Sequence, residues 1–329
     1  MSDAASPGRQ DWNHRPEVPI ATSPLWQWPP DFPATVKWYR DAWFWITVNL
    51  MVLGLAIISW VWFSPTLAQA ATLSPGWIGM IFLRNFVLIG AVAGGLHLYF
   101  HTLRRQGRDK RFDPRELAAR GRAFTLGSQV RDNMFWTLTS GVAVWSGFEV
   151  LFWWAFGVGY LPVLSFGANP LWFIAIFFLI PIWESLYFYW IHRALHTRWL
   201  YRVAHSLHHR NTNIGPWSGL SMHPIEHVMF LGGVLVHLFV LSHPLHIVFH
   251  LQFYALLAVT THSGFEGLFA GGKKRLHLGN FHHQMHHRYF EVNYGNLDVP
   301  WDKLFGSFHD GTPQAHEAMK VRRRRMQTR

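Results

Sequence analysis

Cysteine is absent from this chain of 329 residues, which excludes disulfide bonds, cysteine-ligated zinc ribbons, iron–sulfur clusters and thiolate nucleophiles. Charged residues are scarce as well, at 14% of the chain against about 25% in ordinary soluble domains. The HPGG haem motif, GxGxxG and CxxC are all missing, so no cofactor of those kinds is indicated. Residues 1–40 are polar and rich in proline, and they lack the short apolar core that a signal peptide needs.

Apolar and aromatic side chains are abundant instead. Half of the residues are hydrophobic and 19 are tryptophan, a residue that favours the membrane–water interface. Because about 20 apolar residues cross a bilayer as a helix, the sequence predicts an all-α integral membrane protein with about four spans and a helical hairpin. The expected spans are residues 42–63, 77–100, 134–156 and 170–191, and the hairpin is 225–241 with 245–261. Arg84 and Glu149 lie inside the second and third spans.

The loops between these spans differ in charge. Segments 64–76 and 157–169 contain no charged residue, whereas segment 103–133 contains nine lysines and arginines. Because cytoplasmic loops carry the Lys/Arg excess, we expect a multi-pass protein of a bacterial inner membrane whose N-terminus, histidine-rich segments and C-terminus are cytoplasmic. The net charge of +11 then favours anionic lipid headgroups as neighbours, and no nucleic-acid partner is expected.

Histidines gather in short boxes on the side predicted to be cytoplasmic: HRALH from His192, HSLHH from His205 and HHQMHH from His282, with a single His262 between them. Residues three or four apart share one face of a helix, so we expect each box to direct its imidazoles to one point. One such box is weak evidence, because interfacial histidines are common. Three boxes on one side of the membrane favour a metal site.

The identity of the metal stays open at this level. Imidazole suits zinc, copper, iron and nickel, but a structural zinc needs only four ligands, and eight or nine histidines would serve two ions. Two redox metals without thiolate ligands favour oxygen chemistry. The alternative from another class is a transition-metal transporter or a metal-binding membrane protein. Transporters place their ligands near the bilayer midplane, whereas these boxes lie at or beyond the ends of the spans.

The boxes HRALH, HSLHH and HHQMHH, together with SMHPIEH, VTTHSGFEG and NYGNLDVPWDKLFGSFHDG, resemble the motifs of the sterol desaturase and fatty acid hydroxylase superfamily. The resemblance covers about residues 130–311 and implies a membrane-embedded helical enzyme with a cytoplasmic helical cap that holds two iron ions. The implied ligands are His192, His196, His205, His208, His209, His262, His283, His286 and His287. Because HPIE resembles a box of the sterol-type branch, His223 and His227 are further candidates.

With this resemblance the chain divides into four parts. Residues 1–40 form a polar arm that we expect to be loosely ordered, and residues 41–133 hold the first two spans and the basic loop. Residues 134–311 form the expected catalytic domain, and residues 312–329 form a basic tail.

Three side chains are expected beside the ligands. Glu184 lies eight residues before His192, so it faces the same way and would orient an imidazole or bond to a neighbouring helix. Glu266 stands where the acyl-hydroxylase branch has a second histidine after the one matching His262, and it would bind metal, support a ligand, or be replaced by His223. His282 shares a helix face only with His286, so we expect His283 to be the ligand and His282 to lie beside it.

The resemblance implies an oxygenase that takes O2 and two electrons from a separate donor, a ferredoxin or reductase. The first expectation is hydroxylation of an unactivated C–H bond in a membrane lipid, either a fatty-acyl chain or a bacterial aminolipid such as an ornithine lipid. The alternative is a sterol or hopanoid desaturase or C-4 methyl oxidase, which the HPIE and HSG motifs favour.

Overall fold

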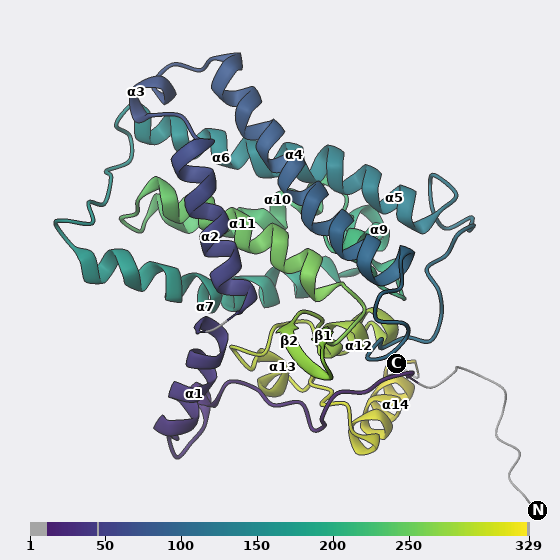
Figure 1. The fold of residues 1–329 in the computed structure, drawn as a ribbon. Helices are drawn as coiled ribbons and strands as arrows, with labels where there is room; N and C mark the ends of the chain where they lie inside the picture. Colours follow the sequence, from purple (N-terminus) through teal and green to yellow (C-terminus); the bar gives the residue numbers. More distant parts are fainter. Residues whose placement is uncertain (1–11, 45, 328–329) are drawn as a thin grey trace, which may run out of the picture.

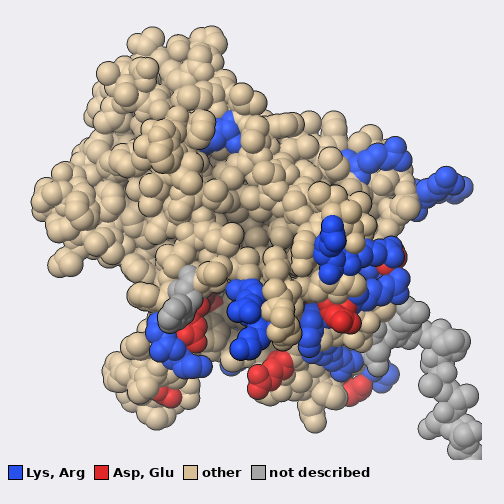
Figure 2. Space-filling model, in the orientation of Figure 1, with Lys and Arg blue, Asp and Glu red and all other residues tan. Residues whose placement is uncertain are grey.

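The computed structural model describes residues 12–44 and 46–327, and their regular structure is almost entirely helical. An apolar helical bundle forms one part of the molecule, and a cap of short helices and one β-hairpin covers one end of it (Figure 1). Lys, Arg, Asp and Glu gather over the cap and the N-terminal helix, while the visible surface of the bundle is nearly free of them (Figure 2). This separation of charge is the one expected of a membrane domain that carries a water-exposed cap.

The bundle contains α2 (Val48–Trp62), α3 (Leu67–Ala70), α4 (Pro75–His97), α5 (Gln129–Trp136), α6 (Val142–Gly157), α7 (Pro170–Leu195), α10 (Pro224–Leu231) and α11 (Pro244–Thr261). Wide π turns extend α4 (Leu98–Thr102) and join α5 to α6 (Thr137–Gly141), and a tight 3-10 segment (Gly232–Leu238) follows α10. The cap contains α8 (Arg198–Leu200), a π turn (Tyr201–His205), α9 (Ser206–His209), a 3-10 turn (Pro216–Ser218), β1 (Gly267–Ala270), β2 (Lys273–His277), α12 (Phe281–Tyr289), α13 (Trp301–Leu304) and α14 (Pro313–Gln327). The chain before the bundle forms a 3-10 turn (Pro24–Trp26) and α1 (Phe32–Trp43).

Three of the described helices are long and apolar enough to cross a membrane: Pro75–Thr102, Pro170–Leu195 and Pro244–Thr261. The pair α1 and α2, bent by 46°, would be a fourth span. The prediction of an all-α integral membrane protein is therefore confirmed. The small antiparallel pair of β1 and β2, in which Gly267 lies opposite His277, was not predicted.

The predicted set of spans needs two corrections. The first span does not begin at residue 42, because α2 starts only at Val48, where the Thr47 hydroxyl caps it by accepting from the Leu50 amide. Segment 134–156 lies in the α5–α6 helix, which is not among the three helices apolar enough to be candidate spans.

The segment predicted as a hairpin of two helices, residues 225–261, does not form two equivalent helices. Its first arm breaks into α10 and a 3-10 segment, and its second arm, α11, is the central helix of the bundle. Helix α11 packs against α2, α4, α6 and α7 and is buried along nearly its whole length. A helix that is apolar all round belongs in such a position, so α11 is the element on which the others assemble.

The N-terminal arm is ordered wherever the structure describes it, which corrects the expectation of a loose segment. The Asn13 amide donates to the Phe112 carbonyl, the Ile20 amide to Asp310 and the Ser23 amide to Leu297. The arm therefore runs along the cap, and α1 follows it. Most of the basic tail, likewise, is helix α14.

Helix starts place the chemically important segments. Asn169, His223, His243 and Asn280 each accept a backbone N–H at the start of α7, α10, α11 and α12. Proline follows the first three of these caps, where its missing N–H has no cost. The ends of α7 and α11 meet α12 of the cap, where His196 contacts His286 and His262 contacts His287.

Candidate metal centre

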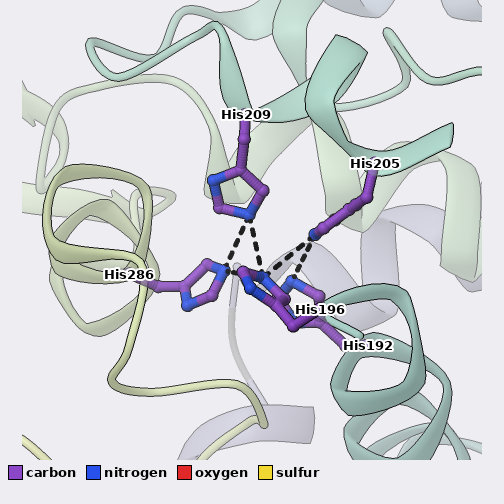
Figure 3. A group of neighbouring side chains, drawn as sticks. All are labelled: His192, His196, His205, His209 and His286. Atoms are coloured by element: carbon purple, nitrogen blue, oxygen red, sulfur yellow. Dashed lines mark hydrogen bonds between the residues drawn. The ribbon is translucent and has the colours of Figure 1, made fainter. Parts of the chain in front are cut away.

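Nine imidazoles converge in two groups where α7 and α11 end. In the first cluster, one ring nitrogen from each of five histidines lies within 4.8 Å of the others. Its members are His192, His196, His205, His209 and His286 (Figure 3). The Nε2 atom of His286 is 3.0 Å from that of His209 and 3.1 Å from that of His196. All five side chains are buried except His196, which is half-buried.

The second cluster contains four buried histidines, His208, His262, His283 and His287. The Nε2 atoms of His262 and His287 are 3.1 Å apart, and those of His283 and His287 are also 3.1 Å apart. The two clusters adjoin, because the rings of His209 and His287 stack with centroids 4.8 Å apart. The structure thus brings together all nine histidines that the family resemblance implies as ligands.

The assignment of ligands to clusters differs from the expectation that each box points to one site. His205 and His209 enter the first cluster while His208 enters the second, and His286 is separated in the same way from His283 and His287. Residues four apart share a helix face, but neighbours in sequence point about 100° apart. Two boxes therefore each supply ligands to both clusters, which ties the two sites into one unit.

Hydrogen bonds hold the outer nitrogens of several of these imidazoles, whereas Nδ1 of His209 and of His287 has no partner among the described residues. Nδ1 of His192 and of His286 donates at 2.6 Å to the carbonyls of Tyr294 and Val292, and Nδ1 of His262 donates at 2.7 Å to that of Ala258. A neutral imidazole that donates through Nδ1 presents a lone pair at Nε2. The backbone thereby fixes the tautomer that a metal ligand needs.

The Tyr294 carbonyl belongs to the segment NYGNLDVPWD, and Val292 directly precedes it. This segment resembles a family motif but had no residue role assigned from sequence. Asn293 holds this segment to the cap by donating to the carbonyls of His282 and His309. The Asp302 carboxylate accepts from the Tyr294 amide at 2.9 Å and from the Gly295 amide at 2.7 Å. Asn293 and Asp302 thus position two ligands indirectly, through backbone.

Gly219 lets the loop before α10 pack directly on α11. A Cβ at this position would lie 2.2 Å from the Ala258 carbonyl oxygen, the same atom that accepts from His262. Any larger residue would push the loop away from a carbonyl that orients a ligand.

Glu226 is the site residue that sequence reasoning missed. Its buried carboxylate accepts from Nδ1 of His205 at 2.7 Å. The available signal was an acid on an otherwise apolar helix, in the HPIE motif.

We expect Glu226→Ala to weaken metal binding by the first cluster by about 10–100-fold, the usual effect of removing a carboxylate that orients a metal-binding histidine. Glu226→Gln is the matched control, because its amide oxygen still accepts from His205. Metal content after dialysis against graded chelator measures both. Equal retention by Glu226→Ala and the native protein would contradict this role.

Both clusters suit metal cations. Burial lowers the pKa of His205 to about 3 and that of His208 to about 4, so these imidazoles are neutral near pH 7. Several lone pairs then face one another at hydrogen-bond distance, an arrangement that a cation between them stabilises. Two nitrogens at right angles, each about 2.1 Å from one ion, lie about 3.0 Å apart, which agrees with the 3.0 Å between His209 and His286.

Two further candidates for metal ligation lie outside the clusters. His223 caps α10 by accepting from the Ile225 amide. His227 uses both ring nitrogens, against the Leu220 carbonyl at 3.0 Å and the Ser140 hydroxyl at 3.3 Å. The structure therefore places neither residue in a cluster, and metal binding by His223 or His227 stays a prediction.

Among the described residues, none of the three side chains expected beside the ligands forms a hydrogen bond with a ligand imidazole. Glu266 bonds to His14 and Lys274, at 2.6 and 2.8 Å, and it belongs to neither histidine cluster. Glu184 accepts at 2.6 Å from Asn296, and it lines the same cavity as five of the clustered histidines. His282 is buried, and neither ring nitrogen has a hydrogen-bond partner within the described residues. It faces Phe308 rather than a cluster.

A cavity of about 50 Å³, here called the inner cavity, borders both clusters. His192 and His205 of the first cluster and His208, His262 and His283 of the second line it. Most of its other walls are apolar and include Phe188, Leu195, Met222, Phe230, Leu257 and Ala258. Besides the histidines, its polar lining residues include Glu184, Glu226, Thr261, Asn280 and Asn296. Two metal-binding clusters thus face one small, largely apolar space.

The part of the chain that carries the histidine clusters is similar to known proteins. Residues 177–307 match the family model described as "Fatty acid hydroxylase". Lathosterol oxidase of Homo sapiens is 35% identical over 126 residues, which cover 38% of this chain and 42% of that protein. Lathosterol oxidase of Rattus norvegicus is 37% identical over 122 residues (36% and 40%), and the Delta(7)-sterol 5(6)-desaturase of Eremothecium gossypii is 32% identical over 136 residues (41% and 37%).

The matched region thus spans only about two fifths of the length of these relatives. None of the solved structures matches the chain significantly. The matched region nevertheless contains all nine converging histidines. Residues 177–307 of this chain therefore belong to the superfamily of fatty acid hydroxylases and sterol desaturases.

Proposed function

We propose that this protein is a membrane oxygenase that binds two iron ions in its histidine clusters and desaturates a sterol-like ring lipid. The observation that carries the proposal is the pair of adjoining imidazole clusters against one apolar cavity. The matched part of the chain is similar to proteins named lathosterol oxidase and Delta(7)-sterol 5(6)-desaturase. This similarity favours a ring lipid over an acyl chain as the substrate.

The irons would supply the activation of O2 that allows hydrogen to be removed from an unactivated C–H bond. The protein's own contribution is positional. Carbonyls of Val292, Tyr294 and Ala258 hold the Nδ1 protons of three ligands, and Glu226 holds that of His205. Phe188, Met222 and Phe230 keep the inner cavity apolar, so a hydrocarbon carbon can lie against the clusters while water is excluded.

Hydroxylation of a lipid, including a fatty-acyl chain or an aminolipid, is the second candidate, which the description of the family model favours. Each reaction consumes one O2, two electrons and two protons. Desaturation removes two hydrogens from the lipid and yields two waters, whereas hydroxylation inserts one oxygen atom and yields one water. The mass of the product therefore distinguishes them.

The electrons would come from a separate ferredoxin or reductase, for which the charged face of the cap offers a docking surface (Figure 2). We propose that this face is cytoplasmic, because the basic segment 103–133 lies on it and the neutral loops lie at the other end of the bundle. This orientation would place the basic tail near anionic lipid headgroups.

The test is turnover of lathosterol by the purified, iron-loaded protein with O2, a ferredoxin, its reductase and NADPH. We expect a product that has lost two hydrogen atoms, formed only with O2 and absent with the His286→Ala variant. A product with one added oxygen would favour the second candidate. A protein that binds one readily exchangeable zinc and oxidises no lipid would instead match a metal transporter.

A further inference from the structure

A second pocket of the cap lies where the N-terminal arm, α12 and α14 meet. This pocket, here called the outer pocket, has a volume of about 270 Å³. Its walls include Trp12 and Arg15 of the arm, Tyr289 of α12, His309 of the turn before α14, and His316 of α14. Helix α14 lies on the side of the cap away from the bundle (Figure 1). The arm, the turn and α14 all lie outside residues 177–307, the segment that matches the family model.

His309 supplies this pocket with a hydrogen-bond donor that has no acceptor. Its side chain is buried, and its Nδ1 accepts from the Gly311 amide at 3.1 Å. Burial lowers the pKa of His309 to about 4, so near pH 7 the ring is neutral and carries its one N–H proton on Nε2. Nε2 has no hydrogen-bond partner among residues 12–44 and 46–327. Because a buried donor without an acceptor is costly, an acceptor group bound beside this ring stabilises the cap.

Positive charge exceeds negative charge around the two histidines of the pocket. Burial has the largest effect on the pKa of His309 and of His316, and the charged side chains that act on them are four cations and two acids: Arg15, Arg288, Lys320 and Arg322 against Asp310 and Glu317. Both acids are already engaged. Asp310 accepts from the amide and the hydroxyl of Thr312, and Glu317 pairs with Lys320 at 2.8 Å. The described groups thus leave an excess of two positive charges, which suits a dianion.

Helix α14 begins at the outer pocket. Pro313, its first residue, lines the pocket, and the hydroxyl of Thr312 accepts from the Ala315 amide at 3.2 Å. The start of a helix carries a partial positive charge, which favours an anion. At about 270 Å³, the pocket lies just below the range of about 300–1,000 Å³ for drug-sized ligands, so it suits a small molecule.

We propose that the outer pocket binds the phosphate group of a small, water-soluble phosphate monoester. A phosphate monoester carries a charge of about −1.5 to −2 at pH 7 and three strong acceptor oxygens, which match the excess of positive charge and the N–H of His309. The same group also occurs on lipid headgroups. Helix α14 faces away from the bundle (Figure 1), so the structure favours a ligand from the water around the cap. This site is independent of the oxidation proposed above.

A ligand in the outer pocket joins three separate segments. It contacts the arm through Arg15, α14 through His316 and α12 through Tyr289, whose ring stacks on His309 with centroids 5.6 Å apart. Helix α12 also carries three of the clustered histidines. Because a ligand that binds only the folded state stabilises it, we expect the bound phosphate to slow hydrogen exchange of the α12 amides.

The test measures binding of glycerol 3-phosphate to the full-length protein in phosphate-free detergent by isothermal titration calorimetry. We expect one saturable site per chain, and we expect Arg15→Gln and His309→Phe each to raise Kd at least tenfold. Arg323→Gln is the matched control, because it removes one charge from α14 at a residue that pairs with Glu291 and does not line the pocket. It should bind as the native protein does. If His309→Phe misfolds, Arg15→Gln decides, since Arg15 is exposed.

Two competitors test the class and the source of the ligand. Acetate carries a single charge and should not displace glycerol 3-phosphate at a hundredfold excess, so displacement by acetate overturns the preference for a dianion. Phosphatidic acid carries the same phosphate monoester on a lipid. If nanodiscs that contain it raise the apparent Kd for glycerol 3-phosphate above that in phosphatidylcholine nanodiscs, the water-soluble source is overturned. The absence of saturable binding, or native affinity in both Arg15→Gln and His309→Phe, overturns the site.

Discussion

Replacing His286 with alanine is expected to release metal from the first cluster and to lower turnover by more than about 100-fold. His286 lies 3.0–3.1 Å from two other ligand nitrogens and is fully buried. Loss of only the group that hydrogen-bonds to a metal-binding histidine typically costs about 10–100-fold in metal affinity or activity. Loss of the histidine itself should therefore have a larger effect. Metal content per chain and lathosterol turnover measure the effect.

Helix α12 supplies the control for this prediction. His282 and His283 are neighbours on that helix and both are buried, but only His283 reaches a cluster. His283→Ala should lose metal from the second cluster, whereas His282→Ala should keep both ions. The two variants are matched because each removes one buried imidazole from the same helix. If His282→Ala loses metal while His283→Ala retains it, the assignment of ligands along α12 is wrong.

The second large effect concerns stability. Arg84 of α4 and Glu149 of α6 form an ion pair inside the bundle, and both side chains are buried. Arg84 also donates to the Phe63 carbonyl and the Ser64 hydroxyl, and Asn85 donates to Glu149 at 3.3 Å. We expect Glu149→Ala to lower the free energy of unfolding by about 3–5 kcal/mol, because it leaves a buried guanidinium without its counter-charge.

The double variant Arg84→Met with Glu149→Met separates the cost of an unpaired charge from the value of the pair. Replacing a buried ion pair with apolar residues of similar volume is often neutral or stabilising, so the double variant should unfold at a higher temperature than Glu149→Ala. Thermal unfolding in detergent, followed by loss of helical circular dichroism, compares the three proteins. A double variant as unstable as Glu149→Ala would show that the packing of these side chains, rather than their charge, is what matters.

Local features made much of the molecule predictable. The spacing of the histidines predicts that those at the end of α7 share one helix face, as do those of α12 that lie four residues apart. The start of α7 is marked by Asn169 and Pro170, and that of α12 by Asn280. The first span was placed wrongly because Ala42 and Trp43 are apolar enough to continue it, yet the chain bends before Val48. Apolar composition does not reveal such a bend, because residues on either side of it are equally suited to a membrane.

The position of α11 shows a second limit. Its apolar sequence predicts burial, but burial against lipid and burial against α2, α4, α6 and α7 have the same composition. Spacing along one helix has a similar limit. Because Glu184 lies eight residues before His192, it was expected to orient a ligand imidazole or to bond to a neighbouring helix. It bonds instead to Asn296, which is 112 residues away in the chain.

By itself, the sequence determined that this protein is helical, membrane-embedded and equipped with boxes of histidines at one end of its spans. These properties depend on composition and on spacing within single helices, which neighbouring residues decide. Only the tertiary structure decided that His208 and His209 lie in different clusters, that Glu226 orients His205, and that α1 lines a pocket beside α11. Each of these depends on where separate segments meet: His209 and His286, for example, are 77 residues apart and their ring nitrogens are 3.0 Å apart. Contacts of that kind arise from the packing of the whole chain, because no local pattern specifies which helix ends will face each other.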